Sequence, residues 1–319
     1  MDVRTIASDT TVTYDLPALA DRLRSILGDE NVRVDEPMSE HTTFEIGGPA
    51  QLFVTPQTVE TLRVALDTCR SFGAPLFVLG CGSDLLVSDE GYEGVIVCLA
   101  DGLGDIEVEG TRMTCQAGVT LKDAAEAACA LSLAGLEFAC GIPGSVGGAV
   151  FMNAGAYDGQ MADVVESVDA ITPEGELVSI AGDQMEFGYR MSRVRSEGLV
   201  VVSATLRLEE DDEAAIRARM DDLTERREAK QPLEMPSAGS TFKRPEGYFA
   251  GKLITDAGMQ GKSVGGAQVS TKHAGFVVNT GGATAADVRG LIALVQEEVK
   301  RQFGVDLEPE VRFLGKDPR

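Results

Sequence analysis

The sequence contains no tryptophan and two histidines among 319 residues. His41 and His273 stand far apart and belong to no cluster with metal-ligand spacing, which argues against a zinc site. No apolar run approaches the length needed to span a membrane, and residues 1–5 lack the apolar core of a signal peptide. The six cysteines form no C-x-x-C pair, and most have apolar neighbours, as buried free thiols do. We therefore expect no metal, no membrane insertion and a reduced, cytoplasmic protein.

Basic residues are also scarce, because 28 Lys and Arg stand against 51 Asp and Glu, for a net charge of −23. Nucleic-acid binding requires clustered cations, so we expect no nucleic-acid partner. An anionic ligand must be bound by a few local cations against an unfavourable overall field. Individual arginines are therefore of special interest. The length predicts two or three domains, and no obligatory protein partner is evident.

Hydrophobic periodicity and capping signals predict a mixture of helices and strands. Strands are expected over residues 76–79, 95–99 and 311–314, with a pattern of strands and turns from 164 to 208 that includes 199–202. Two prolines in the segment 231–236 mark a connector. The expected fold class is α+β. The helices are predicted over residues 15–27, 58–72, 121–134, 211–229 and 284–303.

The most informative stretch runs from Gly141 to Tyr157 and contains no charged side chain. Its glycines allow the backbone to approach a ligand closely and to adopt positive φ. Exposed N–H groups in such a turn form a concave site for anions, most often phosphate. Ser145, Asn153 and Tyr157 add neutral hydrogen-bonding groups. A tight structural turn beside a small-residue strand explains the same pattern, so these residues alone leave both interpretations open.

A second glycine turn, residues 80–87, follows the strand predicted at 76–79. Two turns that expose backbone suggest a ligand with two phosphates, such as a dinucleotide. Neither turn is a complete G-x-G-x-x-G that opens a helix in a βαβ unit, so a Rossmann site is not supported.

Three further motifs carry side chains suited to catalysis. Arg190 follows Tyr189 in a short polar turn, Ser240 lies in a segment rich in small hydroxyl residues, and Glu310 precedes the last strand. Taken singly, each has an ordinary interpretation: a surface arginine, a turn or cap serine, and an exposed glutamate. Their joint order and spacing are more specific than any one of them.

Taken together, these segments resemble the UDP-N-acetylenolpyruvoylglucosamine reductase (MurB) family over roughly residues 40 to 315. The chain is similar to the shorter class of this family, which lacks a substrate-covering insertion and has arginine at the position of Arg244. The matching segments are residues 42–50, 80–87, 137–157, 189–192, 239–245, 249–254, 269–276 and 310–312.

The resemblance implies an FAD-binding fold of the vanillyl-alcohol-oxidase (PCMH) type in two subdomains, residues 1–75 and 76–209. A C-terminal α+β substrate domain, residues 210–319, is expected to close over a sugar nucleotide. The implied reaction is the reduction of UDP-N-acetylglucosamine enolpyruvate to UDP-N-acetylmuramate in peptidoglycan precursor biosynthesis. Bound FAD and NADPH as co-substrate are implied, and the partner is a UDP-linked enolpyruvyl amino sugar.

By the same resemblance, Arg190, Ser240 and Glu310 are the catalytic residues. Arg190 is expected to stabilise negative charge on the substrate, Ser240 to donate a proton to C2, and Glu310 to have a raised pKa. The predicted substrate-binding residues are Tyr189, Arg244, Lys252 and Arg312. The predicted cofactor-binding residues are Gly80, Cys81, Gly82, Ser83, Asp84, Leu85, Gly141, Ile142, Gly144, Ser145, Val146, Gly147, Gly148, Asn153 and His273.

Two positions depart from the family pattern, because members commonly have glycine and asparagine where this chain has Cys81 and Asp84. A carboxylate close to a pyrophosphate repels it, unless the side chain turns away or accepts hydrogen bonds from nearby N–H groups.

Three other functions remain as alternatives. An oxidase or dehydrogenase of the same fold superfamily would need a base at the flavin, and the motifs around Arg190 and Ser240 weigh against it. A non-catalytic nucleotide-binding protein would bind ligand without turnover. A serine hydrolase is not supported, since no G-x-S-x-G elbow is present.

Overall fold

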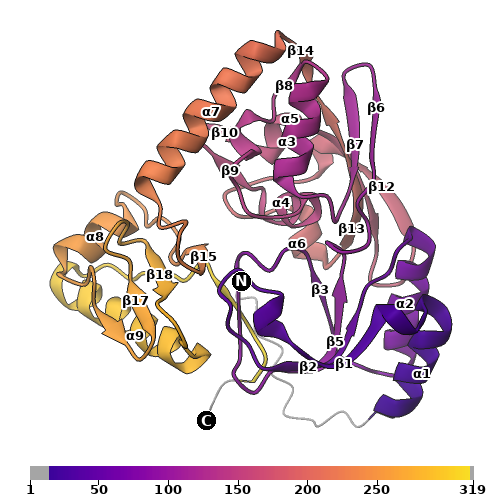
Figure 1. Ribbon diagram of the computed structural model, residues 1–319, viewed down its shortest axis with the longest axis horizontal. Coiled ribbons are helices and arrows are strands. Elements are labelled where there is room, and N and C mark those ends of the chain that lie inside the picture. The colour runs from indigo at the N-terminus through magenta and orange to yellow at the C-terminus, as the bar shows by residue number, and fades with distance from the viewer. Residues whose placement is uncertain (1–13, 317–319) are drawn as a thin grey trace.

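The computed structural model describes residues 14–316 (Figure 1). Residues 1–5, in which the sequence analysis finds no signal-peptide core, lie outside the described residues. Within residues 14–316, no helix is both long and apolar enough to cross a membrane. The same part of the chain holds no group of three or more His, Cys, Asp or Glu side chains able to bind a metal ion.

The first unit is a four-stranded sheet in the order β1-β2-β5-β3, with two helices packed against it. Asp15 and Thr58 cap the helices at the predicted positions, and their apolar faces bury leucines in the core. Since β3 and β5 pair with each other and β5 pairs with β2, the sheet crosses the predicted division at residue 75. A division near residue 100 follows this sheet better. The elements are α1 (Leu16–Leu27), β1 (Val32–Pro37), β2 (Pro49–Val54), α2 (Val59–Ser71), β3 (Leu76–Leu79) and β5 (Tyr92–Cys98).

The second unit is a five-stranded antiparallel sheet in the order β12-β11-β13-β7-β6, and α4 packs on β13. Its core is continuous with that beneath α1 and α2. The elements are β6 (Ile106–Glu109), β7 (Arg112–Gln116), α3 (Leu121–Ala130), α4 (Val146–Met152), β9 (Gly155–Ala156), β10 (Gly159–Gln160), α5 (Met161–Val164), β11 (Val165–Ile171), β12 (Leu177–Ala181), α6 (Arg193–Glu197) and β13 (Val200–Arg207).

One prediction in the second unit is wrong in detail, and one helix there was not predicted. The helix expected over 121–134 ends at Ala130, because Ser132 adopts a positive φ of 58° and the chain then pairs as a strand. That strand, β8 (Leu133–Ala134), pairs with β14 (Glu209–Glu210). The glycine-rich run also opens a helix, α4, which the sequence analysis did not expect.

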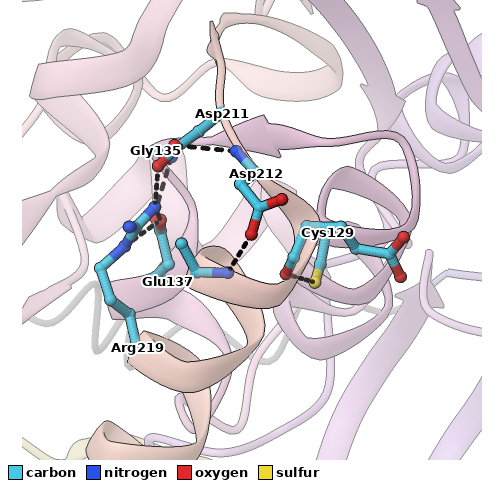
Figure 2. Close-up of polar contacts among 8 residues, drawn as sticks. Cys129, Gly135, Glu137, Asp211, Asp212 and Arg219 are labelled. Atoms are coloured by element: carbon cyan, nitrogen blue, oxygen red, sulfur yellow. Dashed lines mark hydrogen bonds and ion pairs between the residues drawn. The ribbon is translucent and has the colours of Figure 1, made fainter.

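The helix α7 (Glu213–Lys230) runs from the second unit to the third, as Figure 1 shows in orange. It packs on α3 and on the turn Glu137–Ala139, and its buried Ile216 and Met220 belong to the core of the first two units. Figure 2 shows the contacts at its start, where Arg219 binds Glu137 and Asp211. By its packing, α7 belongs to the second unit, so a division near residue 231 fits better than one at 210.

The third unit has its own core and a four-stranded sheet in the order β15-β18-β17-β16. The last strand of the chain, β19 (Arg312–Leu314), leaves this unit and pairs in parallel with β4 (Leu85–Val87) of the first unit. This return places the segment around Glu310 next to the first glycine turn. The division into three domains itself stays a prediction. The other elements are β15 (Ser237–Ser240), α8 (Ala250–Asp256), β16 (Ser263–Val264), β17 (Ala267–Val269), β18 (Phe276–Asn279) and α9 (Ala285–Phe303).

Candidate functional site

Two adjoining cavities lie where the three units meet. The larger, about 590 Å³, is lined by both glycine turns and by residues of the third unit. The smaller, about 430 Å³, is lined by Tyr189 and by residues of α8 and its neighbouring loops. Among residues 14–316, only Arg190, Ser240 and Glu310 line both cavities. The three predicted catalytic residues are thus brought together at the junction of the two cavities.

The two glycine turns form one wall of the larger cavity, although they are far apart in the sequence. A Cβ added at Gly80 would lie 2.3 Å from Ser145 Oγ, and one at Gly144 would lie 3.5 Å from Ser83 Oγ. Gly82 has a φ of 60°, and a Cβ there would lie 2.1 Å from the carbonyl oxygen of His41. A side chain at Gly80 would therefore prevent the two turns from meeting, and one at Gly82 would clash with the backbone of His41.

This wall carries backbone donors that the protein itself does not use. The N–H groups of residues 80–84, and those of Gly144 and Ser145, donate to no acceptor within the described residues. Buried or half-buried N–H groups normally have partners, and a series of open ones is suited to phosphate oxygens. The wall therefore fits the pyrophosphate of a flavin dinucleotide.

A cation that the sequence analysis missed lines the same cavity. Arg227 of α7 is half-buried, and its Nε is buried with no hydrogen-bond partner within residues 14–316. Burial lowers the pKa of Arg227 below its ordinary value, and no carboxylate offsets this effect. Gly141 is needed beside it, since a Cβ there would lie 2.8 Å from Arg227 Cδ. An anionic ligand in the cavity would supply the missing counter-charge.

The sequence gives little indication that Arg227 lines a cavity. The segment 211–229 is rich in charged residues, and the one local signal is that Arg227 follows Ile216, Met220 and Leu223 at helical spacing and so shares their face. Gln231, which follows the same helix, also lines the larger cavity and has a buried Oε1 without a partner among the described residues.

Arg190 and Glu310 form an ion pair in which Arg190 Nε donates to Glu310 Oε1 over 2.6 Å. Arg190 has a φ of 55° in a turn closed by hydrogen bonds between Gly188 and Met191. Arg195 Nη1 supports this strained backbone by donating to the carbonyl oxygen of Arg190 over 2.9 Å. Neither Nη group of Arg190 has a partner among the described residues, so both are available to a ligand.

Burial raises the pKa of Glu310, and the neighbouring Arg190 guanidinium opposes this effect without reversing it. This is the direction that the sequence analysis predicts. Ser240 ends β15, where an irregular register follows Gly239, whose φ is 70°. Its side chain is exposed to the cavities, and its Oγ has no hydrogen-bond partner within the described part of the chain. A bulge of this kind commonly re-aims a functional side chain.

Three predicted cofactor-binding residues do not line either cavity. Val146 is fully buried in the core, and Gly141 makes room for the stem of Arg227. Asn153 uses its amide to hold neighbouring loops: Nδ2 donates to Gln160 Oε1 and to the carbonyl oxygen of Gly188, both at 3.1 Å. Its Oδ1 accepts from a backbone N–H of α5. These three residues support the site from behind its walls. The other predicted residues of the two turns line the larger cavity.

His273 lies in the smaller cavity and not beside the glycine turns. Its Nδ1 accepts from the Gly275 N–H over 3.1 Å, and burial lowers its pKa, so the ring is neutral at pH 7. Arg312, predicted to bind substrate, lines the larger cavity instead, between the rings of Phe77 and Phe151. Any role of either residue in binding stays a prediction.

The remaining predicted substrate residues line the smaller cavity. Arg244 lies over the exposed Phe249 ring at 4.0 Å, and its N–H donates to the Tyr189 hydroxyl over 3.2 Å. Lys252 is exposed and paired with Asp256 at 2.8 Å. Exposed rings beside cations suit a ligand with a heteroaromatic base and phosphates.

Burial shifts the pKa of both unusual residues of the first turn toward the neutral form. Burial raises the pKa of Cys81 to about 11, so its thiol is neutral near pH 7. Burial also raises the pKa of Asp84 to about 7, although Arg312 opposes the shift.

Comparison with known proteins agrees with this arrangement. Residues 50–181 match the FAD binding domain, and residues 231–314 match the C-terminal domain of UDP-N-acetylenolpyruvoylglucosamine reductase. The chain is 53% identical over 295 residues to UDP-N-acetylenolpyruvoylglucosamine reductase from Clostridium perfringens, covering 92% of this chain and 97% of that protein. It is 49% identical to the enzyme of that name from Clostridium botulinum, covering 93% and 96%.

A solved structure extends the likeness to three dimensions. The crystal structure of the reductase from Thermus caldophilus has a TM-score of 0.78 and 37% identity, covering 89% of this chain and 100% of that one. The predicted α+β fold with an FAD-binding region of the vanillyl-alcohol-oxidase type is confirmed. The chain therefore belongs to the UDP-N-acetylenolpyruvoylglucosamine reductase (MurB) family and is an FAD-dependent oxidoreductase.

Proposed function

We propose that this chain reduces UDP-N-acetylglucosamine enolpyruvate to UDP-N-acetylmuramate with NADPH, as a cytoplasmic step of peptidoglycan precursor biosynthesis. One observation carries the proposal. Arg190, Ser240 and Glu310 lie between a cavity that fits a flavin dinucleotide and a second cavity lined by cations and exposed aromatic rings. The relatives from both Clostridium species bear the name of this reductase.

The residues of the larger cavity hold FAD, which supplies hydride transfer from the nicotinamide and on to the double bond of the substrate. The open N–H groups of residues 80–84 and of Gly144 and Ser145 bind its pyrophosphate, and Arg227 balances part of the negative charge. The apolar part of the wall excludes water from the reacting groups.

Arg190 binds the carboxylate of the enolpyruvyl group through its Nη groups, because Nε is occupied by Glu310. Negative charge develops on this carboxylate and on C2 when C3 accepts hydride. A fixed guanidinium, partly removed from water, stabilises that charge without reorganising. Glu310 orients Arg190 through Nε, and protonation of its carboxyl group, which burial favours, would remove a negative charge from beside the substrate.

Ser240 donates a proton to C2. Its Oγ has no acceptor or donor partner among the described residues, so the proton is not committed to another bond. A hydroxyl is a weak acid, but a carbanionic carbon is a strong base, so the transfer is favourable. The smaller cavity binds the UDP part of the substrate, with Arg244 near the phosphates and the rings of Tyr189 and Phe249 near the base.

The test is NADPH oxidation by the purified protein with and without the UDP-linked enolpyruvyl sugar. We expect rapid oxidation only with the sugar present, one NADPH consumed for each lactyl ether formed, and negligible oxygen consumption. Oxidation coupled to oxygen and indifferent to the sugar would instead identify an oxidase of the same fold.

A further inference from the structure

Asp84 is the one acidic residue of the first glycine turn, and it lines the larger cavity. Oδ2 is buried, and neither carboxyl oxygen has a hydrogen-bond or ion-pair partner within residues 14–316. Only its backbone is engaged, since the Asp84 carbonyl oxygen accepts from the Arg312 N–H over 2.9 Å. A buried, ionised carboxylate in this state would be strongly destabilising, whereas a neutral acid with an O–H to donate would not.

The charged groups around Asp84 come from three further segments. They are Arg312 of β19, Glu310 just before it, Arg195 of α6 and Arg190 of the turn before that helix. None of the arginines approaches within ion-pair distance in the described structure: Arg312 packs between two phenylalanine rings, and Arg190 binds Glu310. Burial therefore outweighs their attraction and raises the pKa of Asp84 to about 7.

We propose that Asp84 binds the flavin dinucleotide as a neutral carboxylic acid, donating a hydrogen bond from its O–H to an oxygen of the cofactor. The adjoining N–H groups of residues 80–83 are donors as well. The whole turn therefore presents hydrogen-bond donors and no negative charge to the ligand. An asparagine amide would offer a donor of nearly the same shape at this position. The proposal rests on FAD binding by this chain and not on the reaction that follows.

A pH dependence of cofactor affinity follows from this assignment. The phosphates of the bound cofactor disfavour the ionised form, so the pKa of Asp84 is higher in the complex than in the free protein. Below about pH 7 the carboxyl is already protonated and affinity is at its full value. As the pH rises above this value, binding must take up a proton, and the dissociation constant grows by up to about tenfold per pH unit.

The experiment is a titration of the full-length protein, freed of flavin, with FAD between pH 6 and pH 9, followed by quenching of flavin fluorescence. We expect the wild-type dissociation constant to rise by about 10- to 100-fold between pH 7 and pH 9. Asp84→Asn should bind FAD as tightly as wild type does at pH 6 and lose most of this pH dependence. Asp105→Asn is the matched control, since it removes the same charge from an exposed position outside both cavities.

Calorimetry of wild-type protein in two buffers of different ionisation enthalpy supplies a second measurement. At pH 8 we expect uptake of up to one proton for each FAD bound, and close to none with Asp84→Asn. A wild-type affinity that does not change with pH would overturn the proposal, as would an Asp84→Asn variant that keeps the wild-type slope or binds more weakly at pH 6. Either result leaves FAD binding itself intact, so it is distinct from a failure of the proposed reduction.

Discussion

The Nε of Arg190 lies 2.6 Å from the Oε1 of Glu310, although 120 positions separate the two residues in the sequence. Arg190 comes from the strained turn before α6, and Glu310 from the segment that carries the chain back to β4. The contact therefore depends on the third unit being docked on the first two. It also leaves both Nη groups of Arg190 directed to no other described residue, so the pair orients the guanidinium for a ligand.

Glu310→Gln tests whether the acid is needed in its neutral form. Burial raises the pKa of Glu310. Its carboxyl group is therefore protonated below this raised pKa and loses its proton as the pH rises through it. We expect wild-type kcat to fall on the alkaline side with an apparent pKa above the ordinary value for glutamate, and the glutamine variant to lack this limb. A pH–rate profile with the same alkaline limb in both proteins would contradict the assignment.

Arg190→Lys keeps the positive charge but removes the forked donor. Because a lysine cannot bind Glu310 and a carboxylate at once with planar geometry, we expect kcat to fall by about 10²–10³-fold. Rapid-mixing absorbance should show that NADPH still bleaches the flavin at a rate close to that of wild type. A loss confined to this first step would place Arg190 at the nicotinamide and not at the enolpyruvyl group.

Ser240→Ala removes the proposed proton donor and little else, since the hydroxyl has no protein partner among residues 14–316. We expect flavin bleaching by NADPH to persist while turnover of the enol ether falls by about 10²–10⁴-fold. Ser237→Ala, on the same strand but outside both cavities, serves as the control and should retain activity. Equal losses in the two variants would indicate that β15 is merely sensitive to substitution.

Local sequence signals predicted most of the elements, because these depend on caps and on apolar spacing near each residue. The helix starts at Asp15, Thr58 and Thr284 coincide with side-chain caps in the structure. The end of α3 was missed because a positive φ at Ser132 and a distant strand partner decide it, and neither is visible locally. Contacts between distant residues also determine where one unit ends and the next begins, since the pairing of β3 with β5 and the packing of α7 are long-range.

In the candidate site, too, local sequence signals predict some features and contacts between distant residues determine the others. The glycine turns and the three predicted catalytic residues carry recognisable patterns, and the structure brings them to one junction. The placement of Arg227, the supporting role of Asn153 and the burial of Asp84 could not be predicted, because each depends on contacts between units. In all three cases the residue type suggested one interaction and the surroundings determine another.

Arg219→Gln tests the attachment of α7, whose first turns Figure 2 shows. Arg219 donates to Glu137 Oε1 over 2.7 Å and to Asp211 Oδ2 over 2.6 Å, and Glu137 in turn accepts from the Gly135 N–H. Glu137 is 13% exposed, so loss of its cation leaves a largely buried charge. We expect the free energy of unfolding in urea to fall by about 1–2 kcal/mol. Arg63→Gln, which breaks an exposed pair with Glu60, should cost less than about 0.5 kcal/mol.

Arg227→Gln should have opposite effects on the flavin-free protein and on its complex. Without a ligand, Arg227 is a half-buried cation that no carboxylate balances, and its buried Nε has no partner within the described residues. Removing it should leave the melting temperature of the flavin-free protein unchanged or higher. With FAD, the variant loses a charge-assisted contact to phosphate, and we expect its dissociation constant to rise by about 10- to 100-fold. Fluorescence titration and thermal unfolding measure the two effects, with the neighbouring Arg226→Gln as control. A parallel drop in flavin-free stability and FAD affinity would mean that Arg227 serves the fold and not the cofactor.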